Sequence, residues 1–200
     1  MKDKHLTLEE LTRGIEESRG TPREYELQLR RATKLRQLDR NSEAVSDYFD
    51  VATYSSEKRL FCHAKAMLSL IAIESREYKE ALWWGASAFD SDPSNLDANM
   101  AIGLALIAND FHRMAIPFFE SLIEKDEESS TAQLHLGICL RETLDFQGAH
   151  QVLNQLAETS DYFRLRVVVR VDTVRVTFYS LIERSQQGDT TPILRSLGTT

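Results

Sequence analysis

Apolar residues recur along most of the chain at the three-to-four-residue interval of amphipathic helices, and polar residues separate the resulting blocks. A short leading helix is expected first, and Gly20 ends it. The blocks that follow predict helices over about 22–38, 42–54, 56–75, 78–90, 95–108, 111–125, 130–142 and 145–158.

Short polar motifs mark several of the predicted helix starts. Thr21, Pro22 and Glu24 have the spacing of a capping box with proline in the first helical position. Thr7 with Glu10 offers a weaker version of the same motif for the leading helix. Further side-chain caps are expected at Asn41-Ser42, Ser55-Ser56 and Ser94-Asn95.

The helix predicted over 78–90 carries adjacent tryptophans, Trp83 and Trp84, followed by Gly85, and it stops at Pro93, which cannot continue a helix. A helix that is buried on two sides accommodates one tryptophan inside. We expect a tryptophan to fill the space that the missing Gly85 side chain leaves, because an unfilled gap is destabilising. The alternative is that one tryptophan is exposed as a contact anchor.

Small residues recur along the chain at a fixed interval of 34 positions. One series is Ser69, Gly103 and Gly137, and a second series in the same register is Ala81, Ala115 and Ala149. A constant interval of this length indicates a repeat architecture rather than a single irregular core.

This arrangement resembles the tetratricopeptide repeat (TPR), a 34-residue helix–turn–helix unit, in both small-residue series, in Ala88 and in the closing Pro93. The resemblance covers about 62–161, and Ala32 and Ala44 stand in corresponding places of a degenerate earlier unit. The tryptophan that opens the family's first helix is absent from every unit. The resemblance implies an all-α, TPR-like α-solenoid of about three to four helix-turn-helix repeats.

The segment RLRVVVRVDTVRVTFYSLIERSQQG, which starts at Arg164, carries conflicting signals. Its β-branched residues favour a strand, but strand alternation stops near Val171 and no other segment reads as a pairing partner. Apolar residues keep helical spacing throughout, so we predict a long final helix that caps the array. A second stripe on this helix is a candidate surface for a partner or for self-association, formed by Leu165, Val169, Val176 and Tyr179.

These patterns predict four parts of the chain. They are an N-terminal helical extension over 1–20, a TPR-like repeat array over 21–160, a C-terminal capping helix over 161–188 and a flexible tail over 189–200.

Composition and charge exclude several classes of partner. The 200 residues carry a formal net charge of −7, which argues against nucleic acid and against an anionic membrane surface. The longest apolar runs are too short for membrane insertion, and the charged N-terminus lacks a signal peptide, so we expect a cytoplasmic protein. Cys62 and Cys139 are expected to be buried thiols in a reducing compartment, although one disulfide between them is allowed.

No motif in the sequence predicts catalysis. His135 and Cys139 are four residues apart on one helix face, but two ligands are too few for a metal site. Neither a glycine-rich phosphate loop nor a nucleophile motif is present in the sequence. We therefore expect no enzyme activity, no metal and no cofactor.

The TPR resemblance implies that first helices line a concave groove. Position by position, that groove would hold His63, Ala66, Met67, Leu70, Ile73, Asp97, Met100, Ala101, Leu104, Ile107, Leu134, His135, Ile138 and Arg141. The alternative is that some of these residues belong to the core between the helices. An apolar lining that contains methionine favours a protein or peptide partner with an apolar or amphipathic segment. An acidic rim favours a partner that carries basic residues.

These expectations lead to a non-enzymatic adaptor or chaperone that holds a partner segment in the groove. A narrower version is similar to the small acidic TPR chaperones of type III secretion in size, acidity and repeat layout, and no motif is specific to them. The alternative is a structural scaffold or oligomer subunit, such as a homodimer, that associates through the C-terminal helix. A regulatory domain that binds a small ligand is a third reading.

Overall fold

The computed structural model describes residues 6–126, 129–159, 162–171, 174–184 and 190–199, and it describes side-chain surroundings as far as Leu156. The chain forms two compact units, residues 1–121 and 122–200. The helices in the described residues are α1 (Leu8–Glu17), α2 (Pro22–Gln37), α3 (Asn41–Tyr54), α4 (Lys58–Glu74), α5 (Tyr78–Ser91), α6 (Leu96–Ala108), α7 (His112–Lys125), α8 (Ser130–Glu142) and α9 (Phe146–Thr159).

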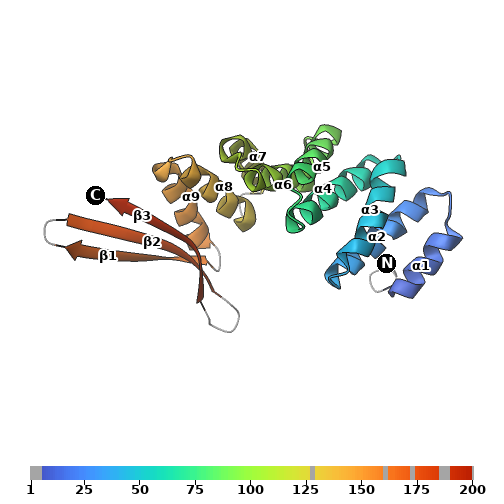
Figure 1. Ribbon diagram of the computed structural model, residues 1–200, viewed down its shortest axis with the longest axis horizontal. Coiled ribbons are helices and arrows are strands. Elements are labelled where there is room, and N and C mark those ends of the chain that lie inside the picture. Colours follow the sequence, from blue (N-terminus) through green and yellow to red (C-terminus); the bar gives the residue numbers. More distant parts are fainter. Residues whose placement is uncertain (1–5, 127–128, 160–161, 172–173, 185–189, 200) are drawn as a thin grey trace. The chain divides into compact units, whose positions relative to one another are not determined.

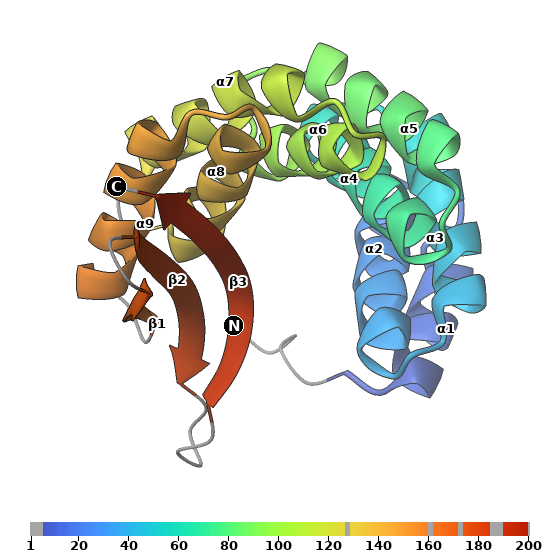
Figure 2. The same cartoon turned by 60° about the vertical axis from the view of Figure 1, so that its left-hand side comes forward.

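Every helix predicted between residues 22 and 158 is present, with bounds within two residues of the prediction. The leading helix is present as α1. In the unit of residues 1–121, α2, α4 and α6 lie along one side, and α3 and α5 lie along the other (Figures 1 and 2). Helix α4 contacts α3, α5 and α6, so it is packed on several sides at once.

The small-residue series lie where helices cross closely. Ser69 of α4 is fully buried, and its hydroxyl donates to the Ala81 carbonyl of α5 at 2.8 Å. A Cβ atom added to Gly103 of α6 would lie 2.8 Å from the ring of Phe119. Small side chains are needed at both places, because a larger one would displace α5 at Ser69 or the fully buried Phe119 ring at Gly103.

The two adjacent tryptophans have different surroundings. Trp84 is 8% exposed and belongs to the core cluster of α2, α3 and α4, whereas Trp83 is 61% exposed. The prediction that a tryptophan fills the space at Gly85 is wrong. A Cβ atom there would lie 3.1 Å from the Ile102 Cα of α6 and 3.1 Å from the Ser69 hydroxyl. The glycine therefore permits close approach of α5 to α6, and no gap is left to fill.

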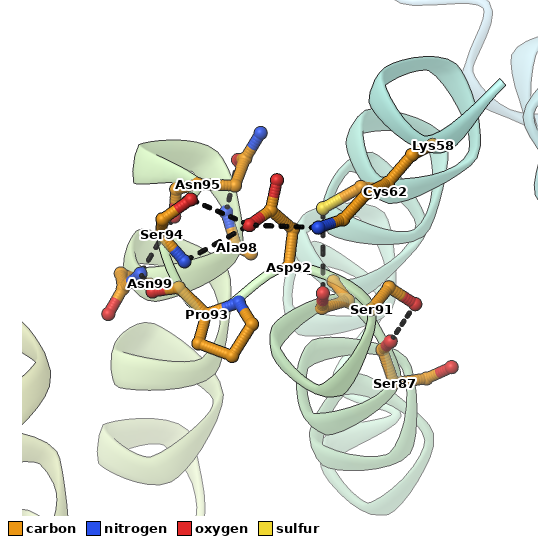
Figure 3. Close-up of polar contacts among 11 residues, drawn as sticks. Lys58, Cys62, Ser87, Ser91, Asp92, Pro93, Ser94, Asn95, Ala98 and Asn99 are labelled. Carbon is orange, nitrogen blue, oxygen red and sulfur yellow. Dashed lines mark hydrogen bonds and ion pairs between the residues drawn. The ribbon is translucent and has the colours of Figure 1, made fainter.

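The turn that follows α5 explains why the helix stops at an Asp-Pro sequence (Figure 3). The Asp92 carboxylate accepts hydrogen bonds from the Ser94 backbone N–H at 3.2 Å and from the Ser94 hydroxyl at 2.7 Å. The same carboxylate lies 3.5 Å from the Lys58 ammonium of α4. These contacts fix the turn against the start of α4, and Pro93 prevents α5 from continuing.

The next helix, α6, begins with the predicted cap. Asn95 is its N-cap, and the Asn95 side-chain oxygen accepts from the Ala98 N–H at 3.0 Å. Asn99, which is 2% exposed, donates to the carbonyls of Pro93 at 2.8 Å and Asn95 at 2.7 Å. The Asn95 side chain thus satisfies an N–H group that a helix start leaves without a partner, and Asn99 ties the helix to the preceding turn.

Asn95→Ala is expected to lower the free energy of unfolding by about 1 kcal/mol, because it removes the acceptor for the Ala98 N–H. Asn95→Ser is the matched control, since serine caps about as well as asparagine and should keep most of the stability. Urea unfolding followed by circular dichroism measures both. An equal loss in the two variants would show that the cap does not stabilise this helix.

Other predicted caps differ from the observed ones. The full capping box forms at Thr7 and Glu10, where each side chain accepts from the other's backbone N–H. The box predicted at Thr21 is wrong, because the Thr21 hydroxyl donates to the Ser18 carbonyl and Glu24 accepts from the Gly20 N–H. The caps predicted at Asn41-Ser42 and Ser55-Ser56 are also wrong. The N-cap residues there are Arg40 and Glu57, without a side-chain cap bond.

The C-terminal part of the chain corrects two predictions. In place of the helix predicted over 161–188, the structure has strands β1 (Tyr162–Val171) and β2 (Val174–Arg184). Strand β3 (Thr190–Thr199) lies within the segment predicted as a flexible tail over 189–200. The order is β1-β2-β3, both neighbouring pairs are antiparallel, and Figure 1 shows the meander. The helix was predicted because a lone strand lacks backbone partners, and here each strand has one.

The strand register also shows how the sheet accommodates a proline. Pro192 lies in the edge strand β3, where a missing N–H is tolerated, and the pairing shifts at Leu181/Ile182, opposite this part of β3. The predicted stripe of Leu165, Val169, Val176 and Tyr179 is therefore not a helical stripe. Its backbone is paired, with Val169 opposite Val176, and its side chains lie outside the described residues. A second surface at these positions stays a prediction.

Among the described residues, none of the helices combines the length and the hydrophobicity that crossing a membrane requires.

Both cysteines are free and buried, as expected from the sequence. Cys62 of α4 donates to the Ala88 carbonyl at 3.4 Å, and burial raises the pKa of its thiol. Burial raises the pKa of the Cys139 thiol to about 11. Both side chains therefore hold protonated, weakly reactive thiols at neutral pH.

A thiol reagent such as dithionitrobenzoate is expected to label neither cysteine rapidly in the folded protein at pH 8. For Cys139, the raised pKa alone lowers the thiolate fraction about 100-fold. Absorbance at the thiolate product band measures labelling, with the urea-unfolded chain as the control that exposes two thiols. Fast labelling of the folded chain would contradict the burial.

Candidate functional site

Two first helices present a row of side chains that the core does not fully enclose. On α4, buried residues such as Ala64 and Leu68 pack toward α2 and α3, and Cys62 and Ala66 pack toward α5 and α6. The remaining face of α4 and its counterpart on α6 hold half-buried residues. We call this surface the α4–α6 stripe, and it comprises His63, Met67, Leu70, Met100, Leu104 and Ile107.

A hydrogen bond joins the two helices at one end of the stripe. His63 Nδ1 lies 2.6 Å from the Asp97 carboxylate, and the two residues are 34 positions apart. Because the repeat length is 34, equivalent positions of successive first helices lie next to each other. The hydrogen bond from His63 lowers the pKa of the Asp97 carboxyl, against a smaller opposite effect of burial. The stabilisation that the His63–Asp97 hydrogen bond provides is therefore present at pH values above the ordinary carboxyl pKa. It is lost as the pH falls through the lowered pKa of Asp97.

A cleft of about 430 Å³ lies at the same end of the stripe, between α2, α4 and α6. It is lined by Glu26, Leu29, Arg30, Arg59, Leu60, His63, Asn95 and Asp97. The lining combines carboxylates and guanidinium groups with two leucines. This end of the surface therefore offers polar contacts of both signs, whereas the stripe beyond it is apolar.

A neighbouring helix covers part of the stripe. Arg36 of α2 donates to the sulfur of Met67 at 3.4 Å and to the Glu74 carboxylate at 2.5 Å. The guanidinium thus lies beside Met67, and the methionine is less accessible than its place on α4 suggests. Arg36 is not among the predicted groove residues, because its contact with Met67 depends on how α2 packs on α4.

Most groove residues predicted in the first unit are only partly buried, and their role in binding stays a prediction. The six stripe residues are half-buried, and Asp97 is exposed beside them. Ile73 is half-buried but packs against the small core of Ala72, Ala81 and Ala105. Ala66 and Ala101 are fully buried between α4, α5 and α6, so the expectation that they line the groove is wrong.

The remaining predicted groove residues belong to α8 in the second unit. Ile138 and Leu134 pack against Leu156 of α9, which is fully buried. His135 is half-buried, and burial lowers the pKa of its imidazole. Arg141 forms an ion pair with Glu142. These contacts give Leu134 and Ile138 a role in the packing of α8 on α9.

Across the described parts of both units, no three histidine, cysteine or acidic side chains lie close enough together to hold a metal ion.

No protein-family model and no curated protein sequence matches the chain. Solved structures do. YrrB, described as a TPR protein with an unusual peptide-binding site, is 19% identical, with a TM-score of 0.62 over 77% of this chain and 76% of YrrB. A TPR protein from Parabacteroides merdae is also 19% identical, with a TM-score of 0.60 over 76% of this chain and 58% of its own. MamA from Desulfovibrio magneticus is 12% identical, with a TM-score of 0.59 over 68% of this chain and 75% of its own.

These similarities confirm the predicted all-α, TPR-like fold of the helical array. At such low sequence identity, these similarities show the fold and do not identify a binding partner.

Proposed function

We propose that the chain is a non-enzymatic protein-interaction module that binds an apolar or amphipathic segment of a partner protein along the α4–α6 stripe. The observation that carries the proposal is the row of half-buried apolar side chains on two adjacent first helices. The core encloses this face only in part, and Arg36 of α2 covers Met67 at one place.

The chemistry of the surface defines the partner segment. Leu70, Leu104 and Ile107 offer branched apolar contacts, and Met100 offers an unbranched side chain that adapts to irregular shapes. The cleft at the end of the stripe offers carboxylates and guanidinium groups. A segment with an apolar face and a polar end would match both parts. A peptide-binding site in the similar protein YrrB supports this use of the fold.

The role of the module in the cell is a finer proposal. An adaptor and a chaperone would use the stripe in the same way and differ in what the partner does next. A chaperone of type III secretion is supported by chain length, acidity and repeat layout alone. Self-association through 162–184, as in a scaffold, is the competing proposal.

The test compares partner capture by matched variants. Leu70→Glu with Leu104→Glu places two charges on the stripe, and Leu38→Glu makes the same change at a residue that is 54% exposed outside it. Each protein serves as bait in lysate of the source cells, and mass spectrometry quantifies what is retained. Circular dichroism confirms that each variant is folded.

The proposal expects a specific partner to be captured by the unmodified chain and the Leu38→Glu variant, and to be lost from the stripe variant at least tenfold, a change of about 1.4 kcal/mol. Undiminished capture by a folded stripe variant would refute it. Capture of no specific partner by the unmodified chain would also count against it.

A further inference from the structure

Three aromatic side chains form a cluster on α3 and α5, away from the α4–α6 stripe. The rings of Trp83 and Trp84 meet edge to face with centroids 4.5 Å apart. The rings of Phe49 and Trp84 do the same at 6.1 Å. We call Phe49, Trp83 and Trp84 the aromatic platform.

The platform combines a buried centre with exposed flanks. Trp84 is 8% exposed and packs into the core of α2, α3 and α4, so it holds the other two rings in place. Trp83 is 61% exposed and Phe49 is 47% exposed. An exposed tryptophan that is held by a buried ring loses little side-chain freedom on binding, which favours its use as a contact.

A carboxylate lies beside the platform. The Trp84 indole N–H donates to the Glu80 carboxylate at 3.3 Å, and Glu80 is exposed. Glu80 precedes Trp83 by three residues, so the two side chains are neighbours on the surface of α5. The site therefore presents an aromatic face and a negative charge together. Lys79 lies four residues before Trp83 and carries the opposite charge.

We propose that the aromatic platform binds an arginine side chain within a basic segment of a partner protein. A planar guanidinium group can stack on the Trp83 ring while it donates to the Glu80 carboxylate. The net charge of −7 favours approach of a basic segment over an acidic one. This site lies on a second helix and does not depend on binding at the α4–α6 stripe.

The experiment uses the two tryptophans as separate probes. The chain has two tryptophans, so the ¹H–¹⁵N spectrum shows two indole signals, and Trp83→Leu assigns them. The probe is a pentapeptide with a central arginine between leucines. Its matched control carries citrulline, which keeps the shape of arginine but has no charge. Titration of the full chain with each peptide gives the dissociation constants.

The arginine peptide is expected to shift the Trp83 indole signal and to bind about 2- to 5-fold more tightly than the citrulline peptide, as for an exposed cation–aromatic contact. Glu80→Gln, which keeps an acceptor for Trp84, should remove most of this preference. Lys79→Ala should strengthen binding of the arginine peptide.

Three results would overturn the proposal. The Trp83 signal could stay unchanged with both peptides. The two peptides could bind equally, which would mean an apolar patch without preference for a cation. The Trp83 signal could shift with protein concentration in the absence of peptide, which would place a second copy of the chain on the platform.

Discussion

Arg31→Met is expected to lower the free energy of unfolding by about 3 kcal/mol. Arg31 of α2 forms two hydrogen bonds with the Asp47 carboxylate of α3, at 2.8 and 2.7 Å. The Asp47 side chain is 5% exposed, so removal of Arg31 leaves a buried charge without its partner. Because the Arg31 side chain remains 24% exposed, the expected loss lies at the lower end of the range for buried pairs. Arg31 also donates to Thr12 of α1, so the leading helix should loosen too.

Two controls separate the buried pair from a general effect of charge. Arg40→Met removes an ion pair with Glu43 in which both side chains are about half exposed, and its effect should be much smaller. The double variant Arg31→Met with Asp47→Leu removes both charges and should be more stable than Arg31→Met alone. Urea unfolding at pH 7 measures all three variants. An Arg31→Met variant no less stable than Arg40→Met would contradict the role assigned to the pair.

Gly85→Val is expected to lower the free energy of unfolding by about 3 kcal/mol. The added Cβ would lie 3.1 Å from the Ile102 Cα and 3.3 Å from the Ala101 carbonyl oxygen. Both are backbone atoms of α6, which can give way only if the two helices separate. Valine also brings two further methyl groups into the same contact.

The neighbouring residue offers a matched control for this substitution. Ala86 is half-buried on the same helix, so Ala86→Val introduces the same side chain away from the contact with α6. This variant should lower the free energy of unfolding by only about 0.6 kcal/mol, through the lower helix propensity of valine. Thermal and urea unfolding measure both variants. Equal stability of the two would show that α5 and α6 are further apart than the structure has them.

The helices could be predicted from the sequence because their information is local. A three-to-four-residue apolar period and the 34-residue interval of small residues gave bounds within two residues for α2 to α9. Caps were less predictable, since Arg40 and Glu57 are the N-cap residues although serine and asparagine, which cap better, stand beside them. At Gly85 the missing side chain was taken as a gap, although it marks a close helix crossing.

The C-terminal strands could not be predicted in the same way, because strand pairing is not local. The β-branched residues of 164–171 did favour a strand, but a strand needs a partner, and that partner is β2. Strand β3, which contains Pro192 and Gly198, pairs with β2 in turn. The apolar residues of β1 and β2 also fit helical spacing, and this led to the wrong prediction of a helix.

The α4–α6 stripe could be predicted in outline, since the repeat determines which face of each first helix the core does not enclose. His63 and Asp97 are 34 positions apart, so their contact could also have been predicted from the repeat length. The contact of Arg36 with Met67 could not have been predicted, because these residues of α2 and α4 are not at equivalent positions of the 34-residue repeat. Ala66 and Ala101 were wrongly predicted to line the groove, because the repeat indicates which helix face a residue lies on but not how deeply its side chain is buried.

Photo-crosslinking in the source cells tests the binding role of the α4–α6 stripe most directly. A photoreactive amino acid replaces Leu104 on the stripe or, as the control, Glu120, which is exposed on α7. We expect irradiation to join a specific partner protein to the chain from position 104 and not from position 120. An adduct from position 120 alone, or the same adduct from both positions, would contradict binding along the stripe.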